Sequence, residues 1–190
     1  MQTRMSSRTT CRTLALCGAL SVTALFSIAP ASANAASCRG ADADPGSTEI
    51  KQVQSTTLCL INRERTKRGL RKLRHNSKLG LAATRHSQDM ARRDYFSHDS
   101  LGGRDMVDRI KGTNYVQASQ AWALAENIGY GTGGSSTPRT MVRMWMNSPG
   151  HRANILNRRF REIGIGVARG APSGSGGSGA TYTTDFGARG

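Results

Sequence analysis

Serine and histidine come close together in the sequence at two places, where a nucleophile and a general base could meet. Ser97 directly precedes His98, and Ser148 lies shortly before His151. A serine hydrolase needs such a pair, oriented by a third group. However, neighbours on an extended chain point to opposite sides, and neither serine lies in a G-x-S-x-G elbow. The H-E-x-x-H helix of zinc peptidases is also missing. A peptidase-like hydrolase is therefore only the alternative interpretation of these residues.

The first 35 residues have the pattern of a secretory signal peptide. An arginine-bearing start is followed by an apolar run over 14–29. Ala33-Asn34-Ala35 then matches an A-x-A cleavage site, with Ala31-Ser32-Ala33 as the alternative. The run is shorter than the roughly 20 apolar residues that span a bilayer. We therefore expect residues 1–35 to be removed and the protein to be secreted and extracellular, without a membrane span.

Cysteine usage points to the same oxidising environment. Of the 4 cysteines, Cys11 and Cys17 lie in the signal segment, which leaves Cys38 and Cys59. An even pair in an exported protein predicts a disulfide. Closing this loop stabilises the fold by about 3 kcal/mol in the chain-entropy model. The bridge would fasten a leader strap at 36–48 to a single domain at 49–190.

The charge of the chain limits its partners. Lys and Arg total 27 against 12 Asp and Glu, a formal net charge of +15 at pH 7. In an exported protein such charge favours anionic cell-wall polymers or phospholipid headgroups. Aromatic residues are only 5% of the chain, too few for repeated base stacking, so we expect no nucleic-acid partner. We expect the protein to be a monomer.

Apolar residues recur at helical spacing in the first half of the domain. Ser47 or Thr48 is placed to cap a first helix that Gly69 closes, and Ser77 to cap a second. The apolar stripe of the second helix includes His86. We interpret this histidine as a hydrogen-bonded residue of the core or of a cleft wall, not as a ligand.

The second half changes from helices to strands. A short helix is expected over 106–110, and Thr137 with Pro138 opens another helix, which Pro149-Gly150 stops. Alternating residues predict strands within 125–130, 162–169 and 182–186, the middle one half-buried. Helices followed by a small antiparallel sheet indicate the α+β class.

Several segments together resemble a known family. They occur in a fixed order: Phe96-Ser97-His98; Ala125-Glu126-Asn127-Ile128; Trp145 to Leu156 (WMNSPGHRANIL); Gly164-Ile165-Gly166-Val167-Ala168; and Thr184-Asp185-Phe186-Gly187. This series resembles the bacterial secreted branch of the CAP superfamily, named for cysteine-rich secretory proteins, antigen 5 and plant pathogenesis-related proteins. The resemblance implies an α-β-α sandwich with a small three-stranded antiparallel sheet between helical layers.

The resemblance also implies a cleft with two histidines and two acidic residues. By motif these fall on His98, His151 and Glu126, while the second acid, expected just after Trp145, is missing. Two imidazoles and a carboxylate can hold Zn²⁺ or another divalent cation and leave one position open. The resemblance further implies lipid or sterol binding, and together with the charge this makes a lipid or an anionic cell-wall polymer the expected partner.

Three further residues are expected to support this cleft. Asn127 would satisfy backbone groups of the adjacent loop, and Ser148 and His86 would line or brace the cleft. Glu126 would orient the imidazoles or balance their charge. The preferred function is therefore an extracellular binding module.

Overall fold

A four-stranded sheet forms the centre of the structure, a computed structural model that describes residues 37–117, 121–172 and 179–190. In spatial order the strands are β1 (Arg74–His75), β3 (Glu162–Arg169), β4 (Ala180–Arg189) and β2 (Trp122–Gly131). Strands β3, β4 and β2 are antiparallel, as predicted, whereas β1 pairs in parallel with the start of β3. The sequence did not reveal β1 because a strand of 2 residues is too short to show a period.

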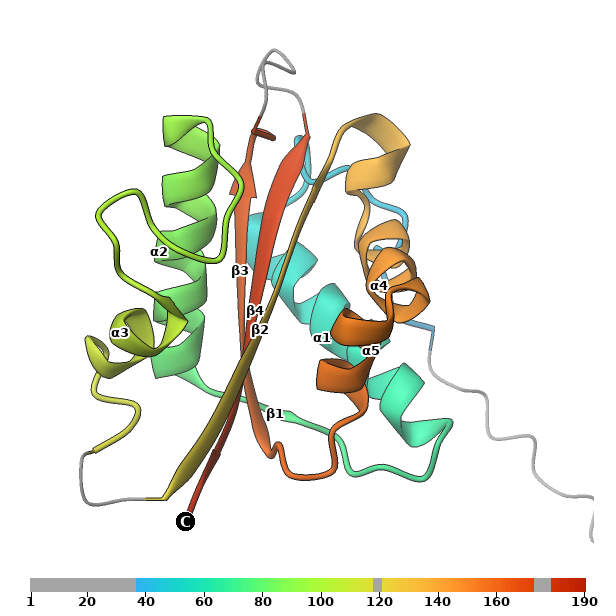
Figure 1. The fold of residues 1–190 in the computed structure, drawn as a ribbon. Helices are drawn as coiled ribbons and strands as arrows, with labels where there is room; N and C mark the ends of the chain where they lie inside the picture. The colour runs from blue at the N-terminus through green and yellow to red at the C-terminus, as the bar shows by residue number, and fades with distance from the viewer. Residues whose placement is uncertain (1–36, 118–120, 173–178) are drawn as a thin grey trace, which may run out of the picture. The chain divides into compact units, whose positions relative to one another are not determined.

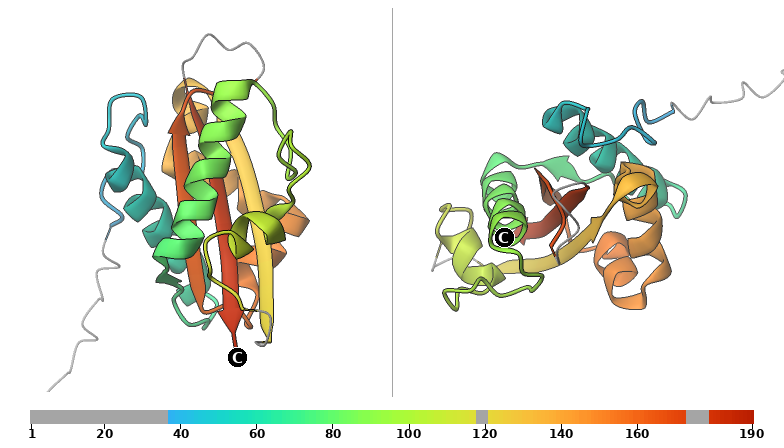
Figure 2. Two further views of the ribbon diagram at one scale, coloured as in Figure 1. Left: turned by 90° about the vertical axis from the view of Figure 1, so that its left-hand side faces the viewer. Right: turned by 90° about the horizontal axis from the view of Figure 1, so that it is seen from above.

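Helices cover both faces of this sheet, which confirms the α-β-α layers (Figures 1 and 2). Their bounds are α1 (Ile50–Thr66), α2 (Ser77–Arg93), α3 (Met106–Lys111), α4 (Pro138–Asn147) and α5 (Pro149–Leu156), with a 3-10 turn η1 (Gly133–Ser136) before α4. One layer holds α2 and α3, and the other holds α1, α4 and α5.

The caps of α1 and α2 differ from those predicted. Helix α2 is capped by Asn76, whose side chain accepts hydrogen bonds from the backbone of Lys78 and Leu79, so Ser77 is the first helical residue. Helix α1 begins after Glu49, which makes no side-chain cap bond. Ser47 and Thr48 instead belong to a preceding turn, in which both backbone N–H groups and the Ser47 hydroxyl donate to the Asp44 carbonyl.

Proline shapes the connection between α4 and α5. Thr137 caps α4 and Pro138 is its first residue, as predicted. Pro149 was predicted only to stop α4, but it is also the first residue of α5. The reason is that a proline lacks the N–H that a first helical turn leaves unbonded, so the same residue can end one helix and begin the next.

Strand β3 is buried on both faces, not half-buried as predicted. Ile163, Ile165 and Val167 face the core shared with α1 and α4. On the other face, Gly164 and Gly166 let α2 approach so closely that an added Cβ would lie 2.0 Å from the Leu79 backbone and 2.2 Å from that of Ala83. The alternation of apolar residues with glycine imitates that of a strand with one exposed face.

The N-terminal strap is fastened to the helical layer at several points. The predicted disulfide is confirmed, with the Cα atoms of Cys38 and Cys59 5.7 Å apart. Asp42 makes a two-oxygen ion pair with Arg139 of α4 at 2.7 and 3.0 Å. The predicted signal peptide lies outside the described residues. No helix in the described part of the chain is long and apolar enough to cross a membrane.

Candidate functional site

The candidate site lies on β2, at the edge of the sheet. Glu126 is opposite Asp185 of β4 in the strand register. The outward carbonyls of β2 are covered by side chains: Asn154 of α5 donates to the Glu126 carbonyl at 3.2 Å, and Trp145 of α4 donates to that of Ile128 at 3.0 Å. An edge strand normally exposes such carbonyls. Helices α4 and α5 therefore close this edge and hold β2 in place.

A buried carboxylate is the centre of the site. Glu126 Oε1 lies 2.7 Å from His98 Nδ1, and Arg109 donates to Glu126 Oε2 at 2.6 Å. The Glu126 and Arg109 side chains are 2% and 6% exposed, whereas the His98 side chain is 55% exposed. Two buried, oppositely charged groups thus hold an imidazole that is open to solvent.

Arg109 also fixes the loop that carries His98. From α3, its guanidinium donates to the backbone carbonyls of His98 at 2.7 Å and Arg104 at 3.2 Å. One side chain therefore connects α3, the loop before it and the sheet edge. Because Arg has five fixed donors on a planar group, it can make all these bonds together.

The contacts shift the pKa values of Glu126 and His98 in opposite directions, and each shift favours the charged form. Burial works to raise the pKa of Glu126, but the His98 hydrogen bond and the Arg109 charge lower it on balance. The Glu126 hydrogen bond raises the pKa of His98 above its usual value of 6.5. Each shift favours the charged form, so the pair behaves as a buried carboxylate with a bound imidazolium over a wider pH range than free side chains would.

His151 approaches the site from α5. Its backbone carbonyl accepts a hydrogen bond from the Asn127 side chain at 3.1 Å, and Asn154 donates to Asn127 at 2.9 Å. Burial, followed by the charge on His98, lowers the pKa of His151. His151 therefore favours its neutral form more than a free histidine does.

The other predicted cleft residues, Ser148 and His86, have separate contacts. Ser148 forms the junction of α4 and α5, and its side chain makes no cap bond. His86 is buried on α2, with Nε2 2.9 Å from the Ser97 carbonyl, and burial lowers its pKa. The Ser97 hydroxyl accepts from the Asp99 backbone. Among the described residues, neither serine hydroxyl is hydrogen-bonded to an imidazole, so the arrangement of a serine nucleophile is not formed.

Two functional candidates were missed by sequence reasoning. Asp185 is fully buried beside Glu126, and burial and the neighbouring carboxylate raise its pKa well above the usual value. Neither of its oxygens has a hydrogen-bond partner in the described part of the chain. Its place in the Thr184-Asp185-Phe186-Gly187 segment was a usable signal, because an acid inside an apolar strand is expensive to bury. Arg109 carries no such signal and resembles any other basic residue of a helix.

A metal site would use the imidazoles more directly than the carboxylate. No group of three or more His, Cys, Asp or Glu side chains within 37–117, 121–172 and 179–190 is arranged to hold a metal ion. Both Glu126 oxygens are already hydrogen-bonded, one to His98 and one to Arg109. Glu126 can therefore orient His98, as carboxylates orient metal-binding histidines, but is not free to bind a metal itself. Metal binding by His98 and His151, with or without Glu126, therefore stays a prediction.

A small cavity lies beside the exposed imidazole. Its volume is about 210 Å³, and it is lined by His98, Asp99, Asp105, Met106, Val107 and Glu126. The loop that carries His98 and the start of helix α3 supply most of this lining. The Arg109 contacts that fix this loop therefore also fix the shape of the cavity.

The comparison with known proteins agrees with the fold and the order of motifs. The profile of the cysteine-rich secretory protein (CAP) family matches residues 58–185, and the chain belongs to this family. An uncharacterized Bacillus subtilis protein, YkwD, is 35% identical over 141 residues, which cover 73% of this chain and 48% of that protein. The B. subtilis membrane protein YlbC, also uncharacterized, is 36% identical over 63% of this chain and 34% of its own length. This chain thus spans about half of YkwD and a third of YlbC.

Solved structures show the same fold. An extracellular protein with an SCP domain from Bacillus anthracis is similar with a TM-score of 0.56 and 28% identity, over 72% of this chain and 39% of that one. An outer surface protein of Borrelia burgdorferi has a TM-score of 0.62 at 20% identity, over 75% and 97% of the two chains. At this identity the second likeness shows the fold alone.

Proposed function

We propose that this protein is an extracellular binding module whose ligand contacts the exposed imidazole of His98 at the edge of β2. The observation that carries the proposal is the buried pair of Glu126 and Arg109, which fixes Nδ1 of His98 while most of the ring stays exposed. In the described part of the chain, nothing bonds to the other ring nitrogen, Nε2. A held ring with one unbonded nitrogen can bind a ligand, donating a hydrogen bond when it is protonated and accepting one, or binding a cation, when it is neutral.

The extracellular location is supported by three features. The first 35 residues have a signal-peptide pattern, and the Cys38–Cys59 disulfide suits an oxidising compartment. The similar protein from Bacillus anthracis is also described as extracellular.

Two ligand classes suit the cleft. His98 and His151 would hold a divalent cation such as Zn²⁺, with Glu126 increasing the basicity of His98. Such an ion would supply a Lewis-acid position for a further ligand. A lipid or a fragment of a cell-wall polymer is the second class, because the chain carries a formal net charge of +15 at pH 7.

Isothermal titration tests the cation directly. Zn²⁺ is titrated into metal-free wild type, His98→Ala and His75→Ala, the last being an exposed histidine of β1 and the matched control. We expect binding in wild type and His75→Ala and at least about tenfold weaker binding in His98→Ala. No Zn²⁺ binding by wild type, or equal binding by all three proteins, would refute the proposed cation site.

Mass spectrometry of protein purified from its native host tests the second ligand class. A copurified lipid or wall fragment that is lost in His98→Ala supports binding at the cleft. Turnover of a peptide substrate that disappears in His151→Ala would contradict a purely binding role.

A further inference from the structure

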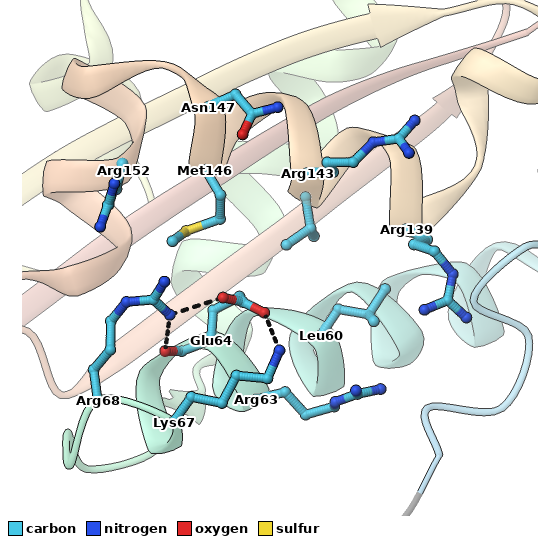
Figure 3. Close-up of a pocket in the computed structure, with 11 residues that line it drawn as sticks. Leu60, Arg63, Glu64, Lys67, Arg68, Arg139, Arg143, Met146, Asn147 and Arg152 are labelled. Carbon is cyan, nitrogen blue, oxygen red and sulfur yellow. Dashed lines mark hydrogen bonds and ion pairs between the residues drawn. The ribbon is translucent and has the colours of Figure 1, made fainter.

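A second pocket, unrelated to His98, lies between α1 and the α4–α5 pair (Figure 3). Its volume is about 340 Å³, at the lower end of the range for small-ligand sites. Six basic side chains line it, against the single carboxylate of Glu64: Arg63, Lys67, Arg68, Arg139, Arg143 and Arg152. We call this the basic pocket.

Half of these cations already have a carboxylate partner. Glu64 pairs with Lys67 at 2.9 Å and with Arg68 at 2.8 Å. Arg139 pairs with Asp42 of the strap. The side chains of the other three, Arg63, Arg143 and Arg152, make no hydrogen bond or ion pair with any residue that the structure describes, so three positive charges around one hollow lack a counter-charge.

The spacing of the cations makes this arrangement unfavourable for folding alone. Arg63 in the last turn of α1 and Lys67 at its C-cap are four residues apart, and so are Arg139 and Arg143 on α4. Like charges at this spacing lie on the same helix face and destabilise the helix. Because α1 packs against α4, the two pairs also face a common space. A feature that costs stability at one place is typical of a binding site.

The chemistry of the lining selects the ligand. Arginine binds phosphate through two parallel N–H donors, and five of the six cations are arginines. Leu60, Val142 and Met146 supply an apolar floor, on which the carbon skeleton between two phosphates can lie. No lining residue is aromatic, which disfavours a nucleic acid held by base stacking.

We propose that the basic pocket binds a segment of a phosphodiester polymer of the polyol-phosphate type, such as those of cell walls. A polymer is favoured over a lipid bilayer because the cations surround a concave pocket and come from three helices. In addition, the large exposed hydrophobic side chains in the described part of the chain, such as Met144 and Phe96, do not line it. The site uses none of the cleft residues, so it stands independently of the proposal for His98.

Calorimetric titration with poly(glycerol phosphate) tests the proposal. The pocket variant is Arg63→Gln/Arg143→Gln/Arg152→Gln, in which each change removes a cation without a described partner. The control variant is Arg71→Gln/Lys72→Gln/Arg74→Gln, which removes the same charge from exposed residues outside the pocket. We expect about 1,000-fold weaker binding by the pocket variant and a change within about threefold in the control, since each of the three charged hydrogen bonds is worth about tenfold.

Three parallel measurements keep the outcomes distinct. Inorganic phosphate should bind much more weakly than the polymer, and phosphatidylglycerol vesicles should bind no better to wild type than to the pocket variant. His98→Ala should bind the polymer as wild type does. An equal loss of affinity in both triple variants, no binding by wild type, or binding to the vesicles but not to the polymer overturns the proposal.

The stability of the pocket variant gives a check on folding. Because repulsion between like charges is removed, its unfolding temperature should be equal to or above that of wild type. If the triple variant unfolds earlier, Arg143→Gln alone, on an exposed side chain, is titrated in its place and should still weaken polymer binding about tenfold.

Discussion

Replacing Glu126 by Gln tests the buried ion pair that holds the site together. The substitution keeps the size of the side chain and removes its charge. Arg109, which is 6% exposed, is then left without a buried counter-ion, and His98 loses its charged acceptor. Breaking one partner of a buried pair costs about 3–5 kcal/mol. Since the Gln oxygen can still accept one hydrogen bond, we expect about 3 kcal/mol, or roughly 6–12 °C in unfolding temperature.

The matched control is Glu64→Gln on α1. Glu64 also has two basic partners, but their side chains are 57% and 36% exposed, so we expect a loss below about 1 kcal/mol. The assay is equilibrium unfolding in urea at pH 7. The neighbouring Asp185 can ionise in the variant and partly replace the lost charge, and the double variant Glu126→Gln/Asp185→Asn closes that route. If Glu126→Gln costs no more than Glu64→Gln, the buried pair does not stabilise the site.

Three further predictions concern other parts of the molecule. Gly166→Ala would place a Cβ 2.2 Å from the Ala83 backbone, so thermal unfolding should show a protein less stable by about 3 kcal/mol or more. Gly150→Ala, where the new Cβ has no neighbour within 4 Å, should leave stability unchanged. Equal effects of the two substitutions would refute the close packing of α2 on β3. Reduction of the Cys38–Cys59 bond should lower stability by about 3 kcal/mol in urea unfolding, and an unchanged midpoint would show that the strap contributes nothing. Because the pKa of Asp185 is raised, the folded protein keeps a proton that the unfolded chain loses above about pH 3.8. The free energy of unfolding of wild type should therefore fall by about 1.4 kcal/mol per pH unit relative to that of Asp185→Asn, up to the folded pKa. A difference between the two proteins that stays constant with pH would contradict this.

The fold was predictable from the sequence because its signals are local or belong to long motifs. The caps at Thr137 and Pro138 and the alternation in β3 required only neighbouring residues. The errors have the same origin. Asn76 and Ser77 are both good cap residues, and only the backbone conformation selects Asn76. The glycines of β3 look like exposed positions in the sequence, although they are contacts with α2.

The site was predictable only in part, since it depends on contacts between distant segments. Motifs brought His98, Glu126 and His151 to attention but could not show that Glu126 has both oxygens occupied. Arg109 could not be recognised because its contact with Glu126, not its residue type, distinguishes it from the other arginines. The basic pocket was equally hidden, since its cations come from three separate helices and only the net charge of the chain indicated an anionic partner.

The most direct test of the account is an NMR titration of the His98 ring in metal-free protein, with Glu126→Gln for comparison. Folding raises the pKa of His98, so its protonated ring stabilises the folded protein below the unfolded pKa of about 6.5. This stabilisation is lost as the pH rises through the folded pKa. We predict that His98 titrates above pH 6.5 in wild type and at or below 6.5 in Glu126→Gln, where burial and the Arg109 charge still lower its pKa. A wild-type value at or below 6.5, or one that the substitution leaves unchanged, would contradict the claim that the buried carboxylate holds this imidazole.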